Sequence, residues 1–227
     1  MTADGELLRL VVDGTRAVSG LWRRPDRARA CLVLAHGAGA GMRHPFLAGI
    51  ADGLADRGIA SLRYQFLYME EGSRRPDRPE VAHAAVRAAV ATAGRLAPDL
   101  PLVAGGKSFG GRMTSQAQAA DPLPGVRGLA FLGFPLHPAG RPSGERGRHL
   151  SGIGVPMLFL QGTRDALADR QRIEELCDEL APRASLRLFQ DADHSFGVPA
   201  RSGRSNAQVR EAMLDAVTDW IAASVAS

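Results

Sequence analysis

Short apolar runs alternate with longer amphipathic segments along almost the whole chain. Mainly apolar runs typical of buried strands occur at residues 30–36, 59–66, 101–106, 128–134, 155–162 and 185–190. Apolar residues recur at helical spacing over residues 44–58, 79–97, 110–121, 167–181 and 204–225. Strands that alternate with helices favour a parallel sheet, because the connecting helices must pack on its two faces. The pattern therefore predicts an α/β fold.

The remaining segments add an edge and a loop to this sheet. Residues 7–14 and 17–24 are strand-like and are separated by a turn at Asp13 and Gly14, which predicts an antiparallel hairpin at the sheet edge. Residues 137–154 are rich in Gly, Pro and Arg, and they predict a surface loop that is too short for a cap domain. The 227 residues contain no internal repeat and no long linker. One domain spanning residues 1–227 is therefore expected.

A glycine-rich segment between a strand and a helix contains a candidate nucleophile. Residues 106–110, GKSFG, match G-x-S-x-G, the pattern of a serine on a sharp strand-to-helix turn. The pattern alone is weak in a chain with 26 glycines. Its context is favourable, because a predicted strand ends at the motif and a predicted helix follows directly. Gly106, Gly110 and Gly111 would allow the two backbones to approach closely. Ser108 is therefore the candidate nucleophile.

A serine nucleophile needs a base and a group that orients the base. Asp165 and His194 follow Ser108 in the order expected for this architecture, each in the loop after a predicted strand. The carboxyl ends of parallel strands meet at one edge of a sheet, so these three side chains should converge. Asp191 and Asp193 compete with Asp165 as the partner of His194. Asp193 is its immediate neighbour, and adjacent side chains usually diverge, so we expect Asp165 to orient the imidazole.

The segment HGAGAGMRHPF at residues 36–46 is a candidate oxyanion hole. Its small residues leave backbone N–H groups accessible, and the N–H of Ala38 would join that of Phe109, the residue after the nucleophile. A flexible glycine turn into the next helix is the alternative interpretation. His36 is expected to be a structural, hydrogen-bonded histidine rather than a second base.

Lys107 is the only lysine of the chain, and its role stays open. Three interpretations remain: the lysine is incidental in an arginine-rich chain, it forms a structural ion pair behind the turn, or it binds an anion at the site. Arg63, Arg43 and His44 also follow predicted strands, and they would bind a substrate carboxylate or form salt bridges to surface acids. A phosphate-binding loop, G-x-x-x-x-G-K-[ST], is disfavoured because Pro101 stands at its first glycine and the residues between form a strand.

Composition narrows the functional classes. The formal charge of +4 comes from 28 basic and 24 acidic residues that are interspersed, and aromatic residues are only 5%, which disfavours a nucleic-acid binder. The two cysteines and six histidines show no metal-ligand or disulfide spacing, so neither a metal nor a disulfide framework is expected. The N-terminal residues do not resemble a signal peptide, and no run reaches the roughly 18 apolar residues of a membrane span. A cytoplasmic protein without a membrane partner is expected; its oligomeric state stays open.

Four motifs in order resemble the small, lidless α/β-hydrolases related to dienelactone hydrolase: LAHGAGAGMRHPF, GGKSFGGRM, FLQGTRDAL and DADHSF. This resemblance covers nearly the whole chain. It implies the α/β-hydrolase fold without a cap domain, a Ser-His-Asp hydrolase acting on a small acyl substrate, and no cofactor. Dienelactone hydrolase itself carries a cysteine nucleophile where this chain has Ser108, so its substrate is not implied.

The expected activity is that of a carboxylesterase-like serine hydrolase with an acyl-enzyme intermediate. Thioester or lactone hydrolysis would use the same residues, and some relatives in this group resemble interaction proteins without catalysis, so these alternatives stay open. A site without a lid favours small soluble esters. Six apolar side chains have two interpretations, the lining of an acyl pocket or packing in the core, and we favour the core. They are Met42, Met69, Met113, Phe46, Phe109 and Phe134.

Overall fold

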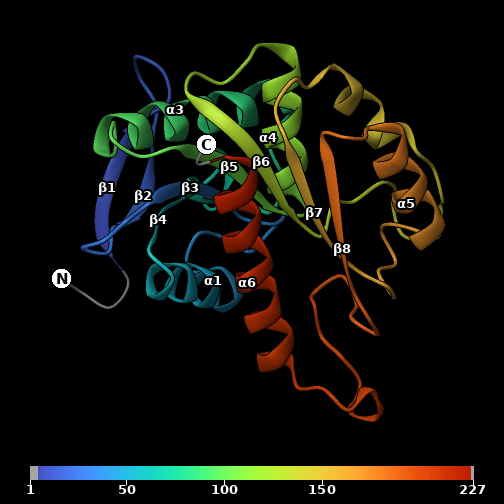
Figure 1. Cartoon of the computed structure of the whole chain (residues 1–227). Helices are drawn as coiled ribbons and strands as arrows, with labels where there is room; N and C mark the ends of the chain where they lie inside the picture. Colours follow the sequence, from blue (N-terminus) through green and yellow to red (C-terminus); the bar gives the residue numbers. More distant parts are fainter. Residues whose placement is uncertain (1–4, 226–227) are drawn as a thin grey trace.

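An eight-stranded sheet forms the centre of the protein (Figure 1). A computed structural model describes residues 5–225. The sheet order is β1-β2-β4-β3-β5-β6-β7-β8. The strands are β1 Glu6–Val11, β2 Ala17–Arg23, β3 Ala30–Ala35, β4 Ile59–Tyr64, β5 Leu102–Lys107, β6 Val126–Leu132, β7 Met157–Gly162 and β8 Ala184–Phe189. Strands β3 to β8 are parallel to one another, β2 pairs antiparallel with β4, and β1 and β2 form the expected antiparallel hairpin at one edge.

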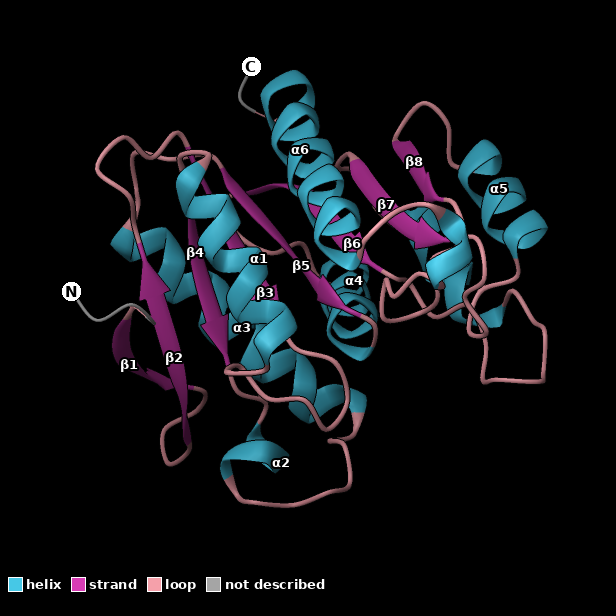
Figure 2. Ribbon diagram, turned by 90° about the horizontal axis from the view of Figure 1, so that it is seen from below, coloured by secondary structure: helices cyan, strands magenta, loops and turns pink. Residues whose placement is uncertain are grey.

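Helices cover both faces of the sheet. They are α1 Pro45–Asp56, α2 Leu67–Glu70, α3 Pro79–Leu96, α4 Phe109–Ala120, α5 Arg170–Glu179 and α6 Asn206–Ser224. The buried side chains of α1 and α6 pack on one face, which is turned toward the viewer in Figure 2, whereas those of α3, α4 and α5 pack on the other. All five predicted helical segments form helices; the one-turn α2 was not predicted, because four residues are too few for a periodic pattern.

The central strands are continuously apolar because both of their side-chain sets are buried. In β3, Cys31 and Val33 pack with α3 and α4, whereas Leu32 and Leu34 pack with α1 and α6. Every residue of β3, β4 and β7 is buried. Apolar and polar residues do not alternate in these strands because helices cover both faces of the sheet.

The segment at residues 137–154 is more ordered than the surface loop that its composition predicts. It contains a 3₁₀ helix, Glu145–Gly152, in which Leu150 is fully buried. The His149 ring is bonded through Nε2 to the hydroxyl of Ser115 in α4, with 2.8 Å between the two atoms. The segment therefore packs against α4, and it forms no cap domain.

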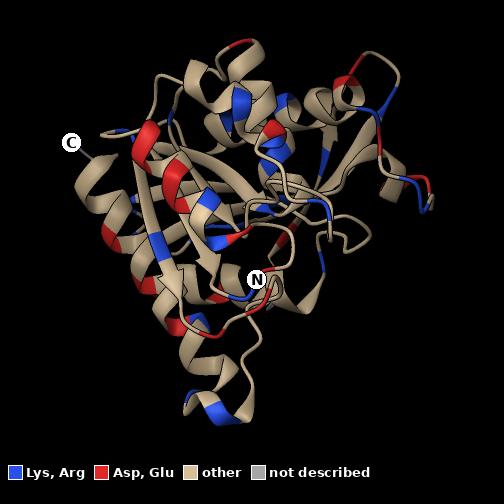
Figure 3. Ribbon diagram, turned by 90° about the vertical axis from the view of Figure 1, so that its right-hand side faces the viewer, with Lys and Arg blue, Asp and Glu red and all other residues tan. Residues whose placement is uncertain are grey.

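Positions of charged residues are dispersed along the ribbon in Figure 3, and several of these residues form ion pairs at the surface. Arg24 lies 2.6 Å from Asp99, and Arg57 lies 2.9 Å from Glu211 and 2.7 Å from Asp215. Exposed pairs of this kind each contribute only about 0–1 kcal/mol to stability. Within residues 5–225, no helix has the length and apolar character needed to cross a membrane.

The strand order places a crevice at the carboxyl ends of β3 and β5. From β3 the chain passes through α1 to β4 on one side, and then returns through α3 on the opposite face to β5 on the other side. Ligands of open α/β sheets bind where the strand order reverses in this way. The loops after β3 and β5 accordingly line one pocket, to which Gly37, Ala38, Lys107 and Ser108 contribute.

The first turn of α4 lies directly against β3. A Cβ atom built on Gly110 would lie 2.6 Å from the carbonyl oxygen of His36, and one built on Gly106 would overlap the carbonyl oxygen of Ala35. Gly106 also has a φ of 156°. The absence of side chains at these positions allows the helix to begin immediately after the strand, as the sequence motif requires.

We expect Gly110→Ala to lower the free energy of unfolding by about 1–3 kcal/mol, because the new methyl group overlaps backbone that cannot move away. Gly94→Ala in α3 is the matched control, since nothing lies within 4 Å of its Cβ position. That change should raise stability by about 0.5–1 kcal/mol through helix propensity. Urea unfolding of both variants measures the difference. Equal effects of the two changes would contradict this account of the packing.

Candidate active site

Ser108 lies on a strained turn between β5 and α4. Its backbone has φ 52° and ψ −114°, a conformation that costs a non-glycine residue about 1–3 kcal/mol. The helix begins at once, with the N–H of Arg112 donating to the Ser108 carbonyl at 3.0 Å. The turn directs the hydroxyl toward the loop that follows β8, where it meets His194.

Ser108, His194 and Asp165 form a continuous chain of hydrogen bonds. The Ser108 hydroxyl lies 2.8 Å from Nε2 of His194, and Nδ1 of the same ring lies 2.7 Å from Oδ2 of Asp165. A carboxylate accepts, so Nδ1 carries the proton and Nε2 is free to accept the serine proton. The Asp165 side chain is fully buried and that of His194 is 23% exposed. Strands β5, β7 and β8 thus bring the three predicted side chains together at one edge.

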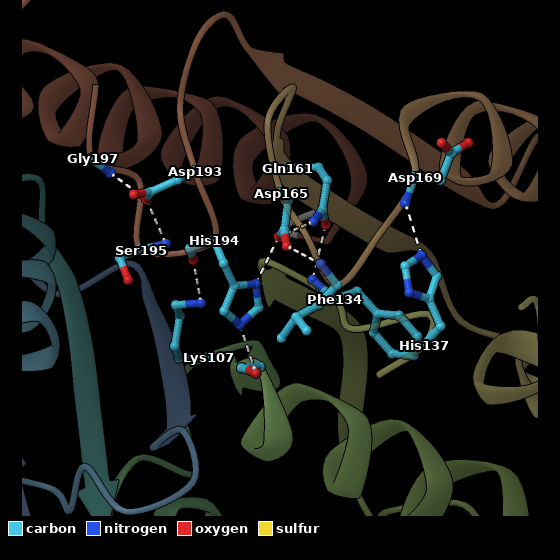
Figure 4. Close-up of polar contacts among 12 residues, drawn as sticks. Lys107, Phe134, His137, Gln161, Asp165, Asp169, Asp193, His194, Ser195 and Gly197 are labelled. Carbon is cyan, nitrogen blue, oxygen red and sulfur yellow. Dashed lines mark hydrogen bonds and ion pairs between the residues drawn. The ribbon is translucent and has the colours of Figure 1, made fainter. Parts of the chain in front are cut away.

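Gln161, at the end of β7, holds the Asp165 carboxylate in place (Figure 4). Its Nε2 donates to Asp165 Oδ2 at 2.5 Å, and its Oε1 accepts the Phe134 N–H at 2.9 Å. The N–H of Leu167 donates to the other carboxylate oxygen at 2.8 Å. Both oxygens of Asp165 are therefore engaged. Sequence reasoning missed Gln161, because an amide at the end of an apolar strand does not reveal its partner; the structure shows that this side chain is fully buried and therefore needs one.

Asp193 has a different role from Asp165. Its Oδ1 accepts the N–H of Ser195 at 2.8 Å and the N–H of Gly197 at 2.9 Å. The carboxylate therefore shapes the loop that carries His194 and does not contact the imidazole. Asp191, the other competitor, has a φ of 60° at the start of the same loop. The geometry thus places Asp165, and neither of these acids, against the ring.

The two expected oxyanion donors are backbone amides in the two segments that meet at Ser108. Phe109 is the first residue of α4, so its N–H has no carbonyl acceptor one turn earlier. The N–H of Ala38 makes no hydrogen bond within residues 5–225. A Cβ built on Gly37 would lie 3.8 Å from the Cβ of Ser108, so the loop after β3 adjoins Ser108. The arrangement suits donation to an oxygen above Ser108.

His36 is a structural group, as its sequence context suggested. It is completely buried; its Nδ1 donates to the Gly37 carbonyl at 2.7 Å, and its Nε2 accepts the Phe66 N–H at 3.2 Å. Burial lowers its pKa to about 4, against an ordinary value of 6.5. The ring therefore stays neutral near pH 7 and joins the loop after β3 to the segment after β4.

The segment after β4 fixes the rest of the loop that follows β3. The Tyr68 hydroxyl accepts the Gly39 N–H at 2.8 Å, and Gln65 Oε1 accepts the Met42 N–H at 2.8 Å. Arg63 donates to the Met42 carbonyl at 3.2 Å and is 1% exposed. The expectation that Arg63 contacts a substrate carboxylate is therefore wrong. Strand β4 is covered on both faces, so this side chain lies beneath the loop and does not line the pocket.

Of the other two expected ligand contacts, only one faces the pocket. His44 lines it, and its Nδ1 also accepts the Phe46 N–H at 3.2 Å as the N-cap of α1. Arg43 is exposed on the same loop but does not line the pocket. His44 is therefore in a position to contact a ligand, whereas the expectation for Arg43 has no support from this geometry.

Lys107 lines the pocket and bonds to the loop of His194. Its Nζ donates to the His194 carbonyl at 2.6 Å and lies 5.6 Å from the centre of the Phe196 ring. Burial lowers its pKa to about 8, although the carboxylates of Asp165 and Asp193 act in the opposite direction. Of the three roles left open for Lys107, a structural one is closest to this geometry. The partner of the ammonium is, however, a backbone carbonyl and not the acid of an ion pair.

A pocket of about 360 Å³ lies over Ser108. Phe46 contributes to its wall, stacked on Phe196 with 6.0 Å between ring centres. The remaining expected apolar side chains do not line it, and four of them lie in the buried core, namely Met42, Met113, Phe109 and Phe134. The lining residues are Gly37, Ala38, Ala40, His44, Phe46, Leu47, Lys107, Ser108, Leu167, His194 and Ser195.

The strand order and the site at the strand ends define an α/β-hydrolase. Residues 28–222 match the family model for the alpha/beta hydrolase domain, and the chain belongs to this family. Two curated proteins from strains of Mycobacterium tuberculosis, each named "putative phosphoribosyl transferase", are 31% identical over 196 residues. The match covers 83% of this chain but 42% of theirs. The chain therefore spans less than half the length of these relatives.

Solved structures share the fold at low sequence identity. A serine hydrolase without a lid from Xanthomonas campestris has a TM-score of 0.73 and 21% identity, with 97% of this chain and 96% of that chain covered. Dienelactone hydrolase from Anabaena variabilis has a TM-score of 0.75 and 18% identity, with 97% of each chain covered. The predicted fold and the resemblance to lidless α/β-hydrolases are confirmed.

A second histidine, the half-buried His149, resembles His36 in its electrostatics. Burial, together with the positive charge of Arg112 and the neighbouring His83, lowers the pKa of His149 to about 4. Between pH 6.5 and 4, the unfolded chain binds protons at both histidines that the folded protein does not bind. The free energy of unfolding must therefore fall as the pH is lowered through this range.

We expect His149→Gln to reduce this acid destabilisation. Each such histidine contributes a slope of up to about 1.4 kcal/mol per pH unit, and the variant loses one of them. Urea unfolding of wild type and variant between pH 6.5 and 4 measures the two slopes. The difference between the proteins isolates His149 from the carboxylates that titrate in both. Parallel curves would show that His149 is protonated as readily in the folded protein as in the unfolded chain.

Proposed function

We propose that this protein is a serine hydrolase that cleaves small acyl esters through Ser108, His194 and Asp165. The observation that carries the proposal is the chain of two hydrogen bonds, 2.8 Å and 2.7 Å long, that joins these side chains. Its serine end lies in the wall of a pocket. A hydroxyl bonded to an imidazole whose other nitrogen is held by a buried carboxylate is the arrangement that acyl transfer requires.

The reaction takes place in two half-reactions. Ser108 Oγ attacks the carbonyl carbon while its proton passes to His194 Nε2, and Asp165 stabilises the resulting imidazolium. The N–H groups of Ala38 and Phe109 donate to the oxyanion. The C–O bond to the alcohol then breaks, and the departing oxygen takes the proton from Nε2. Water repeats the attack on the acyl-enzyme, which returns the Ser108 hydroxyl and releases the carboxylic acid.

The pocket supports a preference for small substrates. Its volume of about 360 Å³ lies at the lower end of the range typical of ligand sites, roughly 300–1,000 Å³. Phe46, Leu47 and Leu167 give it an apolar wall suited to a short acyl chain. Residues 137–154, which would be the place for a lid, pack against α4 and contribute nothing to the pocket wall.

The transferase activity in the name of the mycobacterial relatives is not proposed for this protein. More than half of their length lies outside the match, so a transferase activity of the whole protein need not belong to the shared part. Within the shared part, Lys107 bonds to a carbonyl of its own chain. The arrangement of Ser108 and His194 favours acyl transfer instead.

A fluorophosphonate probe tests the nucleophile directly. We expect the wild-type protein to be labelled on Ser108, and Ser108→Ala to remain unlabelled because the attacking oxygen is gone. His194→Ala should be labelled at least about 10³-fold more slowly, since no base accepts the serine proton. Intact-protein mass spectrometry measures the added phosphonate. A wild-type protein that does not react would remove the basis for the hydrolase proposal.

Asp165→Asn tests the orienting acid. The amide would favour the wrong imidazole tautomer, and we expect kcat to fall by about 10³–10⁴-fold. Asp193→Asn is the matched control, because this carboxylate bonds to backbone N–H groups and does not touch the ring. A larger loss of kcat in Asp193→Asn than in Asp165→Asn would show that Asp193, and not Asp165, orients the imidazole.

A panel of substrates tests the proposed size limit. Nitrophenyl acetate and butyrate should be hydrolysed with a higher kcat/KM than the dodecanoate, because the pocket has room for a short acyl chain only. Matched acetyl thioesters and a simple lactone, assayed beside them, compare the other acyl compounds that the same residues would cleave. Equal rates for short and long chains, or activation at a lipid surface, would argue against the size limit.

A further inference from the structure

Lys107 connects the two reacting side chains through its own backbone and side chain. Its backbone continues directly into Ser108, and its ammonium donates to the backbone carbonyl of His194 at 2.6 Å (Figure 4). The two bonded residues are 87 positions apart in the sequence. One residue therefore joins the turn that carries the candidate nucleophile to the loop that carries the candidate base.

The loop of His194 needs such a contact, because its other backbone bonds are internal. The Asp193 carboxylate binds the N–H groups of Ser195 and Gly197, and the Asp193 N–H donates to the Gly197 carbonyl at 2.9 Å. In the described part of the chain, Lys107 supplies the only hydrogen bond from outside to the backbone of residues 193–197. The loop also contains a strained residue, Phe196, with a φ of 62°.

We propose that Lys107 is a positioning residue, whose bond to the His194 carbonyl holds the imidazole within hydrogen-bond distance of the Ser108 hydroxyl. This inference rests on the proposed hydrolase function, because it assigns to Lys107 the alignment of that reaction's base. A misplacement of a reacting group by about 1 Å costs on the order of 10²-fold in rate, so one hydrogen bond at this place has a large effect.

The surroundings of the ammonium favour this role over substrate binding. Besides the His194 carbonyl and the Phe196 ring, the charged groups that act on it are the carboxylates of Asp165 and Asp193. These two negative charges already compensate the positive charge of Lys107. Both carboxylates would repel a substrate anion. An uncharged carbonyl oxygen accepts a hydrogen bond from the ammonium without this repulsion.

The charge state of Lys107 gives the proposal a pH signature. Burial lowers its pKa to about 8 against an ordinary value of 10.5, with Asp165 and Asp193 opposing that shift. A hydrogen bond from a charged donor is roughly twice as strong as one from a neutral donor. The bond to the His194 carbonyl must therefore weaken as the pH rises through about 8, and the rate should fall with it.

Kinetics of Lys107→Met and Lys107→Arg test the alignment. Met keeps the apolar stem and removes the donor, so kcat should fall by about 10- to 100-fold while KM for a short ester changes little. Arg keeps a charged donor and should restore part of kcat. Arg187→Met, which removes an exposed charge on β8, controls for net charge. An unchanged kcat, or a loss carried by KM alone, would overturn the proposal.

The pH profile separates alignment from a general effect on packing. In wild type, kcat should decline above pH about 8 toward the level of Lys107→Met. The decline should move to higher pH in Lys107→Arg, because a guanidinium stays protonated. Lys107→Met should show no such decline. A wild-type profile that does not change in Lys107→Arg would contradict the role of the ammonium.

Two measurements decide the matter without any turnover. Because Lys107 is the only lysine, lysine labelled with ¹³C at Cε alone gives a single NMR signal, which should titrate near pH 8. Amide hydrogen exchange at Ser195 and Gly197 should accelerate in Lys107→Met and not in Arg187→Met. Unchanged exchange would overturn the positioning role, whether or not the enzyme is active. A wild type without Ser108-dependent hydrolysis would instead remove the proposed function alone.

Discussion

The turn at Ser108 depends on the direct contact of α4 with β3. Gly110 packs on the carbonyl of His36, and Gly106 lies against the carbonyl of Ala35, so there is no room for a side chain at either position. This close approach lets the helix begin within one residue of the strand end. It also forces Ser108 into a positive φ, which turns its hydroxyl toward His194. The position of the Ser108 hydroxyl is thus a consequence of backbone packing, and the strain is supported by the surrounding sheet.

Hydrogen bonds from side chains to backbone hold the loops around this turn. Tyr68 and Gln65 bind N–H groups of the loop after β3, and Lys107 binds the carbonyl of His194. Gln161 joins Asp165 to the strand end of β6 through the Phe134 N–H. Loops at the strand ends have few regular backbone partners, so buried polar groups of this kind determine their shape. The site is consequently built by two sets of residues, those that would react and those that hold them.

The family and the proposed activity rest on different observations. Membership of the α/β-hydrolase family follows from a match over residues 28–222, and the solved structures agree in fold at 14–21% identity. A fold shared at this distance does not determine a reaction. The proposed ester hydrolysis depends instead on the bonds of His194 to Ser108 and Asp165, and on the pocket beside them. The hydrogen bond from the Lys107 ammonium to the His194 carbonyl is a feature of this site that the fold alone does not imply.

The sequence by itself determined the strands, every helix except the one-turn α2, and the order of Ser108, Asp165 and His194, because periodicity and short motifs are local properties of a chain. It also indicated that Gly106 and Gly110 permit a close turn. Only the tertiary structure decided that Arg63 is buried beneath the loop after β3 and that Lys107 binds the carbonyl of His194. Gln161 likewise became recognisable only beside Asp165. Such contacts join residues from different strand ends, and their partners depend on side-chain direction and loop shape, which no local pattern encodes.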